Sequence, residues 1–245
     1  GSELSLCSVI VDDLRSPAEK HILFNDGLFF DFSIINPELT YTLPLKHLAA
    51  GVTDGISHAL EAYVGSDHEE MIFEGYYESI MNTLLKYGPQ AMSNPTDYTI
   101  RSKISHATMI ANHHNFCTEG VQQDWTCHDI ERYITTAYHG VHGITLGILM
   151  PAFMKYVFSR NPRPFVNFSV RCLGVNPEGK NNAAIVKEGA DNFERWLNKM
   201  HLPVKFTDIG LTYPQLISCI PENLTAGMLY QLKGDEIKEL LSLCV

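Results

Sequence analysis

The chain has 245 residues, of which 45% are hydrophobic, and its formal net charge at pH 7 is −10. This length allows one large domain or two small ones with a sizeable buried core. The negative charge argues against nucleic acid and anionic membranes as partners, because both bind basic surfaces.

The six cysteines form no CxxC pair and no regular spacing. Reduced thiols that pack as small hydrophobes are the ordinary role for such cysteines inside a cell. The sequence also shows no signal peptide and no apolar run of about 18 residues, the length that a transmembrane helix needs. We therefore expect a cytoplasmic protein without a membrane partner.

Residues 1–43 differ from the rest of the chain because short β-branched runs dominate them. The runs 6–11 and 28–35 are apolar, so they predict two buried strands joined by a polar loop that contains Lys20. Two strands do not make a stable sheet by themselves. Their unpaired edges favour self-association, for which a homodimer is the simplest form.

From Pro44 onward the spacing of apolar residues becomes helical. Pro44 suits the first turn of a helix, and the apolar residues that follow it recur with a period of about 3.6. The pattern then reaches two internal prolines, and we expect a helix to end near Pro89 and another to kink or break at Pro151. It predicts roughly eight helices, at 45–64, 69–86, 98–116, 128–138, 143–158, about 164–173, 181–200 and 233–243. The chain is therefore predicted to be mainly α.

The segment GVTDGISHALE places Asp54 and His58 four residues apart. On a helix these two side chains lie on one face, one turn apart, where both can bind one ion. Small apolar neighbours predict that the pair faces inward, and a buried acid is costly unless it is paired or bound to metal. From these residues alone, an ordinary surface pair without metal stays open.

His128 and His142 are 14 residues apart in the sequence. On a straight helix they would lie about 20 Å apart, too far to share an ion. Gly140 can supply a bend that brings them together. One acid and three histidines suit a borderline divalent metal such as Fe(II) or Zn(II). Two unrelated histidines are the alternative that the spacing leaves open.

Five motifs, in one order, cover most of residues 1–158. They read GSE at 1–3, NPELTYTLP at 36–44, GVTDGISHALEAYV at 51–64, QQDWTCHDIE at 122–131 and HGITLGILMPAFMKY at 142–156. Together they resemble the C-terminal part of the iron-dependent (group III) alcohol dehydrogenases, in the branch of butanol dehydrogenases and NADPH-dependent aldehyde reductases. Residues 202–211 resemble a late loop of that family more loosely.

The resemblance implies both a fold and a set of site residues. It implies that residues 44–245 form a helical metal-binding domain of the dehydroquinate-synthase-like fold, and that residues 1–43 are a β remnant of an α/β dinucleotide-binding domain. It places Ser2 and Lys20 near the nicotinamide cofactor, although a solvated loop lysine is the alternative for Lys20. It makes the metal ligands Asp54, His58, His128 and His142.

The implied activity is hydride transfer between NAD or NADP and a small alcohol or aldehyde, with Fe(II) as the metal and zinc, manganese or nickel as substitutes. Two features depart from the family pattern. No glycine-rich diphosphate-binding segment occurs, so we expect most of the nucleotide domain to be absent from this chain. Arg132 stands where many relatives carry a histidine, and an arginine does not shuttle protons near neutral pH.

Two other functions stay open. The adjacent His128 and Asp129 are typical of helical metal-dependent phosphohydrolases, which would use Asp129 as a ligand. A helical domain of this kind can also persist as a non-catalytic metal-binding or interaction module. We interpret His106, His113 and His114 as core or surface residues, because their spacing does not let any two of them share an ion.

Overall fold

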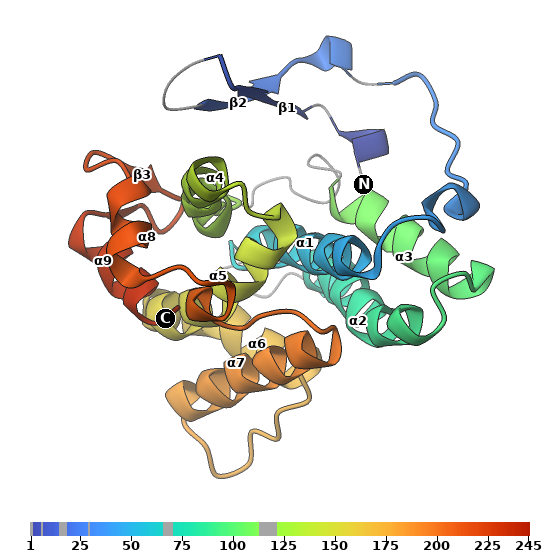
Figure 1. The fold of residues 1–245 in the computed structure, drawn as a ribbon. Coiled ribbons are helices and arrows are strands. Elements are labelled where there is room, and N and C mark those ends of the chain that lie inside the picture. The colour runs from blue at the N-terminus through green and yellow to red at the C-terminus, as the bar shows by residue number, and fades with distance from the viewer. Residues whose placement is uncertain (1, 6, 15–18, 29, 66–70, 113–121) are drawn as a thin grey trace.

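The computed structural model describes residues 2–5, 7–14, 19–28, 30–65, 71–112 and 122–245. Figure 1 shows helices packed against one another, with a two-stranded hairpin lying apart from most of them. None of the described helices has the length and apolar character needed to cross a membrane. Most of the described residues lie in helices and only a few in short strands, so the prediction of a mainly α chain is confirmed.

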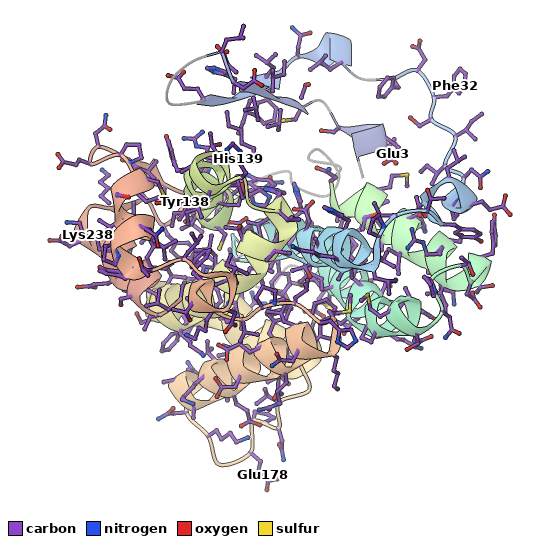
Figure 2. The ribbon with its side chains drawn as sticks, in the orientation of Figure 1. Glu3, Phe32, Tyr138, His139, Glu178 and Lys238 are labelled. Carbon is purple, nitrogen blue, oxygen red and sulfur yellow. The ribbon has the colours of Figure 1, made fainter. Side chains whose placement is uncertain are left out.

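The N-terminal strands are β1 (Cys7–Asp12) and β2 (Glu19–Phe24), which pair antiparallel. The prediction that 28–35 forms the second strand is wrong, and Lys20 lies on β2 rather than in a loop. Strand 7–12 pairs with 19–24, the extended segment nearer to it in the chain, and this leaves the described part of 28–35 without a strand partner. Its Phe32 is 80% exposed and points outward (Figure 2).

The sequence analysis predicted buried strands, and this prediction is also wrong. Val9, Ile10 and Val11 are 52%, 49% and 51% exposed. Among the described residues, α4 (Thr126–Tyr138) packs against β2, which leaves much of the hairpin without a covering layer. Alternation along a strand predicts which residues share a face, but it does not show what covers that face.

All eight predicted helices are present in the described chain. The sequence analysis missed one short helix, α8 (Tyr213–Cys219), whose seven residues are too few for a periodic signal. The short strands β3 (Thr225–Ala226) and β4 (Leu232–Lys233) pair antiparallel near the C-terminus. The helices are α1 (Leu45–Tyr63), α2 (Met71–Ser93), α3 (Tyr98–Ala111), α4 (Thr126–Tyr138), α5 (His142–Val157), α6 (Pro162–Arg171), α7 (Asn182–Lys199), α8 (Tyr213–Cys219) and α9 (Asp235–Ser242).

Helix α2 continues through Pro89 to Ser93, so the prediction that it ends near Pro89 is wrong. A proline inside a helix leaves the carbonyl four residues earlier without its usual donor. Here that carbonyl belongs to Leu85, and it accepts a hydrogen bond of 2.9 Å from the indole Nε1 of Trp196 on α7. A tertiary contact thus replaces the missing helical bond. Helix α5 likewise runs through Pro151 without a break.

Helix α5 is the central element of the helical part. Its Leu146, Leu149 and Phe153 are completely buried. Helices α1, α4 and α7 pack against it (Figure 1). Because α5 begins at His142, this packing brings the predicted ligand His142 next to the helix that carries Asp54 and His58.

Gly143 sets the distance between α5 and α1. A Cβ atom at this position would lie 2.0 Å from the carbonyl oxygen of Ala50, well inside contact distance. Only a glycine allows the two helix backbones to approach this closely. The contact lies one residue from His142, so it fixes the start of α5 beside α1.

We predict that Gly143→Ala lowers the free energy of unfolding by about 1–3 kcal/mol or more, because one of the helix backbones must move. Gly51→Ala is the matched control, since Gly51 also lies in a helix, is exposed, and has no atom within 4 Å of the added Cβ. It should raise stability by up to about 1 kcal/mol through helix propensity. Urea unfolding followed by circular dichroism measures both. Equal effects of the two substitutions would contradict the close contact.

Candidate metal centre

Helix α1 presents Asp54 and His58 on one face, four residues apart. The Oδ1 atom of Asp54 lies 3.7 Å from Nε2 of His58, and the two side chains are 28% and 13% exposed. Neighbouring Val52, Ile56 and Ala59 are buried in the core, so the helix is held firmly behind the pair. The predicted spacing on one face is confirmed.

His128 and His142 come from α4 and α5, and both reach the same carboxylate. Their Nε2 atoms lie 3.9 Å and 3.1 Å from Asp54 Oδ1. The chain turns back between the two helices at His139, whose φ is 50°, followed by Gly140. The expected bend is present, but the left-handed residue is His139 and not Gly140.

These four residues, Asp54, His58, His128 and His142, form the four-donor cluster. One donor atom from each lies within 4.8 Å of all the others. Two ligands bound at about 2.0–2.2 Å to one tetrahedral ion stand about 3.4 Å apart, so the separations suit a shared cation.

The cluster also contains polar atoms that need a partner. Within the described residues, the buried Asp54 Oδ1 and His128 Nε2 have no hydrogen-bond partner of good geometry. Buried polar atoms are seldom left in this state. A divalent cation would satisfy both, and three imidazole nitrogens with one carboxylate oxygen match the preferences of iron and zinc. The residues therefore fit a metal ion.

Two fully buried glutamates hold the outer nitrogens of the histidines. Oε2 of Glu61 contacts Nδ1 of His128, and Oε1 of Glu61 accepts a 2.5 Å hydrogen bond from the backbone of Cys127. Oε2 of Glu131 lies 2.8 Å from Nδ1 of His142. Such carboxylates fix the ring orientation and tautomer of a histidine, which leaves Nε2 directed at the cluster.

The sequence analysis did not single out these glutamates. A signal was available, because Glu61 and Glu131 each stand three residues after a predicted ligand, in the motifs HALE and HDIE. The pairing itself crosses between helices, since Glu61 contacts His128 rather than His58. Spacing along one helix does not predict a contact of this kind.

Lys20 reaches Glu131 from β2. Its Nζ lies 3.2 Å from Oε2 of Glu131, the same oxygen that faces His142. The side chain of Ser2 lies outside the described part of the structure. The structure therefore joins Lys20 to a carboxylate that faces the ligand His142, and the predicted role of Lys20 beside a cofactor stays a prediction.

The pKa values follow from burial and from the carboxylates. Burial lowers the pKa of His58 to about 3 and that of His128 to about 4. Burial also opposes the charge on His142, but the carboxylates of Asp54 and Glu131, which lie 3.1 and 2.8 Å from its ring nitrogens, raise its pKa to about 10. Burial would raise the pKa of Asp54, yet the imidazoles around it hold that pKa below its ordinary value. A cation that binds here displaces the proton of His142.

The remaining candidates lie outside the four-donor cluster. The carboxylate of Asp129 accepts a 2.9 Å hydrogen bond from the backbone of Gly227. His106 is exposed on α3. His113 and His114 lie outside the described residues.

A family model described as the Fe-containing alcohol dehydrogenase family, C-terminal, matches residues 48–242. NADH-dependent butanol dehydrogenase A of Clostridium acetobutylicum is 27% identical over 98% of this chain and 62% of its own length. The NADPH-dependent aldehyde reductase YqhD of Escherichia coli is 29% identical over 91% of this chain and 57% of its own length.

Solved structures agree with these relatives. NADH-dependent butanol dehydrogenase A of Thermotoga maritima superposes with a TM-score of 0.88 at 27% identity, over 100% of this chain and 63% of its own. A crystal structure of Escherichia coli YqhD superposes with a TM-score of 0.90 at 22% identity, over 98% of this chain and 62% of its own, and supports the fold. The chain thus spans 62% of the length of the butanol dehydrogenase from Clostridium.

We predict that Glu61→Ala lowers the free energy of unfolding by about 1–3 kcal/mol, because the backbone N–H of Cys127 is left buried without an acceptor. Glu61→Gln keeps an acceptor for that N–H and should lose less. Glu178→Ala is the control, on an exposed loop between α6 and α7 (Figure 2). Chemical denaturation ranks the three variants. A Glu61→Ala protein as stable as Glu178→Ala would contradict the role of Glu61.

Proposed function

The chain belongs to the iron-containing alcohol dehydrogenase family, and from this premise we propose that its four-donor cluster binds one divalent metal ion. Fe(II) is the proposed native ion, and zinc, manganese or nickel suit the same donors. The single observation that carries the proposal is the convergence of four donor atoms from three helices within 4.8 Å.

The proposed reaction is the interconversion of a small alcohol and its aldehyde with NAD or NADP. With the metal ion and the nicotinamide cofactor bound, the ion would act as a Lewis acid on the substrate oxygen and the nicotinamide would accept or supply hydride. The protein contributes geometry. Glu61 and Glu131 orient His128 and His142, and the core behind α1 and α5 keeps those side chains in place.

Lys20 is proposed to serve the cofactor side of the site. Its ammonium is held by Glu131, which ties β2 to α4 and places Lys20 one carboxylate away from the ligand His142. Ser2 is proposed to approach the cofactor as well. In this proposal residues 1–43 belong to a dinucleotide-binding α/β domain, and residues 44–245 form the helical catalytic domain.

We further propose a cytoplasmic homodimer, with self-association through the exposed hairpin of β1 and β2. Half-exposed Val9, Ile10 and Val11 support this, because an uncovered strand pair favours pairing with another chain. The charge of −10 supports a protein that does not bind nucleic acid.

The hydrogen bond between Asp129 and Gly227 argues against the phosphohydrolase alternative, in which Asp129 would be a ligand. We predict that Asp129→Asn retains the metal. Asp54→Asn and His142→Ala should lower the affinity for the metal by more than about 10–100-fold, the loss that is typical when a residue that only supports a ligand is replaced. Equilibrium dialysis against Zn(II) and Fe(II) measures the retention. His106→Ala, an exposed histidine on α3, is the control.

The same proteins test the reaction. Under anaerobic conditions with Fe(II), NADPH and butanal, any oxidation of NADPH that the chain supports should be lost in His142→Ala. Loss of metal in Asp129→Asn would overturn the ligand assignment. Full metal occupancy without any oxidation of NADPH would contradict dehydrogenase activity by this chain alone.

A further inference from the structure

Trp125 stands immediately before α4 and packs against two of the proposed metal ligands. The centroid of its ring lies 5.4 Å from that of His58 and 5.1 Å from that of His128, with interplanar angles of 72° and 79°. The rings of His58 and His128 are themselves 4.5 Å apart at 63°. The three rings therefore form one edge-to-face group, an arrangement that aromatic pairs prefer.

The backbone of Trp125 adopts a left-handed conformation, with φ 73° and ψ 15°. This conformation is unfavourable for a residue with a bulky side chain, whereas glycine adopts it without steric cost. A strained residue persists only where its surroundings fix it, and such residues cluster at functional sites. What tryptophan supplies here, and glycine would not, is the indole ring beside the histidines.

The completely buried Asp124 fixes this strained turn from two sides. Its backbone N–H donates a 2.9 Å hydrogen bond to the carbonyl of Glu61 on α1. Its carboxylate accepts hydrogen bonds from the backbone N–H groups of Thr126 at 3.0 Å and Tyr230 at 2.9 Å. Helix α1 and the loop between β3 and β4 thus hold the backbone at Trp125 in place.

Gly227 lets the loop between β3 and β4 approach the same turn closely. Its φ is 85°, and a Cβ atom at this position would lie 2.1 Å from Oγ1 of Thr126 and 2.7 Å from Oδ1 of Asp124. Both the backbone angle and the close approach require glycine. The turn that carries Trp125 therefore lies between α1 and a loop near the C-terminus, and it cannot shift without displacing one of them.

The angle of a histidine ring decides where its Nε2 atom points. Rotation of an imidazole about its Cβ–Cγ bond has only broad intrinsic preferences, so contacts must fix it. Glu61 provides one such contact at Nδ1 of His128. The indole of Trp125 provides another for His128 and one for His58. In this arrangement the Nε2 atoms of His58 and His128 lie 3.7 Å and 3.9 Å from Oδ1 of Asp54.

We infer that Trp125 is a positioning residue of the metal centre, and that its indole holds the rings of His58 and His128 with both Nε2 atoms directed at the ion. The inference rests on the proposed function and assigns part of its geometry to a residue that is not a ligand. Loss of the indole should change both the affinity for the metal and the coordination geometry. General destabilisation would not change the coordination geometry in the folded protein.

The test uses the full chain loaded with Co(II), because the visible absorption spectrum of Co(II) reports its coordination geometry. Trp125→Gly removes the indole together with the backbone strain, so this variant should fold. Its affinity for Co(II) should fall by about tenfold or more, and its visible bands should shift. Trp125→Phe keeps an aromatic ring and should retain most of the affinity and the spectrum.

Trp196→Phe is the matched control, because Trp196 is the other tryptophan of the chain. Trp196 lies on α7, and its indole donates a hydrogen bond to the carbonyl of Leu85. Loss of that hydrogen bond should lower the midpoint of urea unfolding and leave the Co(II) affinity and spectrum unchanged. The control thus separates a tryptophan that only stabilises the fold from one that positions ligands.

Co(II) binding by the unsubstituted chain is measured first. A chain that binds no Co(II) contradicts the proposed function, and the inference falls with it. If the unsubstituted chain binds Co(II), an unchanged affinity and spectrum in Trp125→Gly overturn the inference alone. Losses in Trp125→Phe as large as those in Trp125→Gly, or an equal spectral change in Trp196→Phe, overturn it as well.

Discussion

The carboxylate of Asp54 is the point at which three helices meet. Nε2 atoms of His58, His128 and His142 lie 3.1 to 3.9 Å from its Oδ1. Gathering these groups is unfavourable without a proton or a cation among them, because burial penalises each charge and leaves polar atoms without hydrogen-bond partners. The fold supplies the needed rigidity through the core of α1 and α5 and through their backbone contact at Gly143 and Ala50.

Two buried carboxylates extend this arrangement outward. Glu61 links α1 to α4, and Glu131 links α4 to α5 and to β2 through Lys20. Buried ionic groups seldom add stability compared with apolar packing, so their value here lies in orientation. They direct Nε2 of two histidines at one point. The same network connects the hairpin, which is otherwise exposed, to the chemistry proposed for the helical part.

The longer helices and the shared face of Asp54 and His58 could be predicted from the sequence, because both depend only on local patterns. Apolar periodicity predicts the longer helices, and the four-residue spacing of Asp54 and His58 predicts a shared face. Features that depend on distant contacts were not predictable. Helix α2 passes Pro89 because Trp196, far along the chain, binds the carbonyl of Leu85.

The N-terminal segment and the glutamates illustrate the same limit. The apolar run 28–35 has the composition of a strand, but 19–24 is nearer to β1 and takes the pairing. Glu61 reaches His128 across a helix interface that no spacing specifies. The family resemblance names four residues whose donor atoms the fold brings within 4.8 Å of one another, and their role as metal ligands is the proposal made above.

The central claim is that one metal ion binds among Asp54, His58, His128 and His142. Crystals of the Zn(II)-loaded chain, measured at the zinc absorption edge, test this most directly. The account predicts one anomalous peak at bonding distance from Asp54 Oδ1 and from the Nε2 atom of each histidine. A peak at another position, such as the carboxylate of Asp129, or no peak from protein that carries one equivalent of zinc, would contradict it.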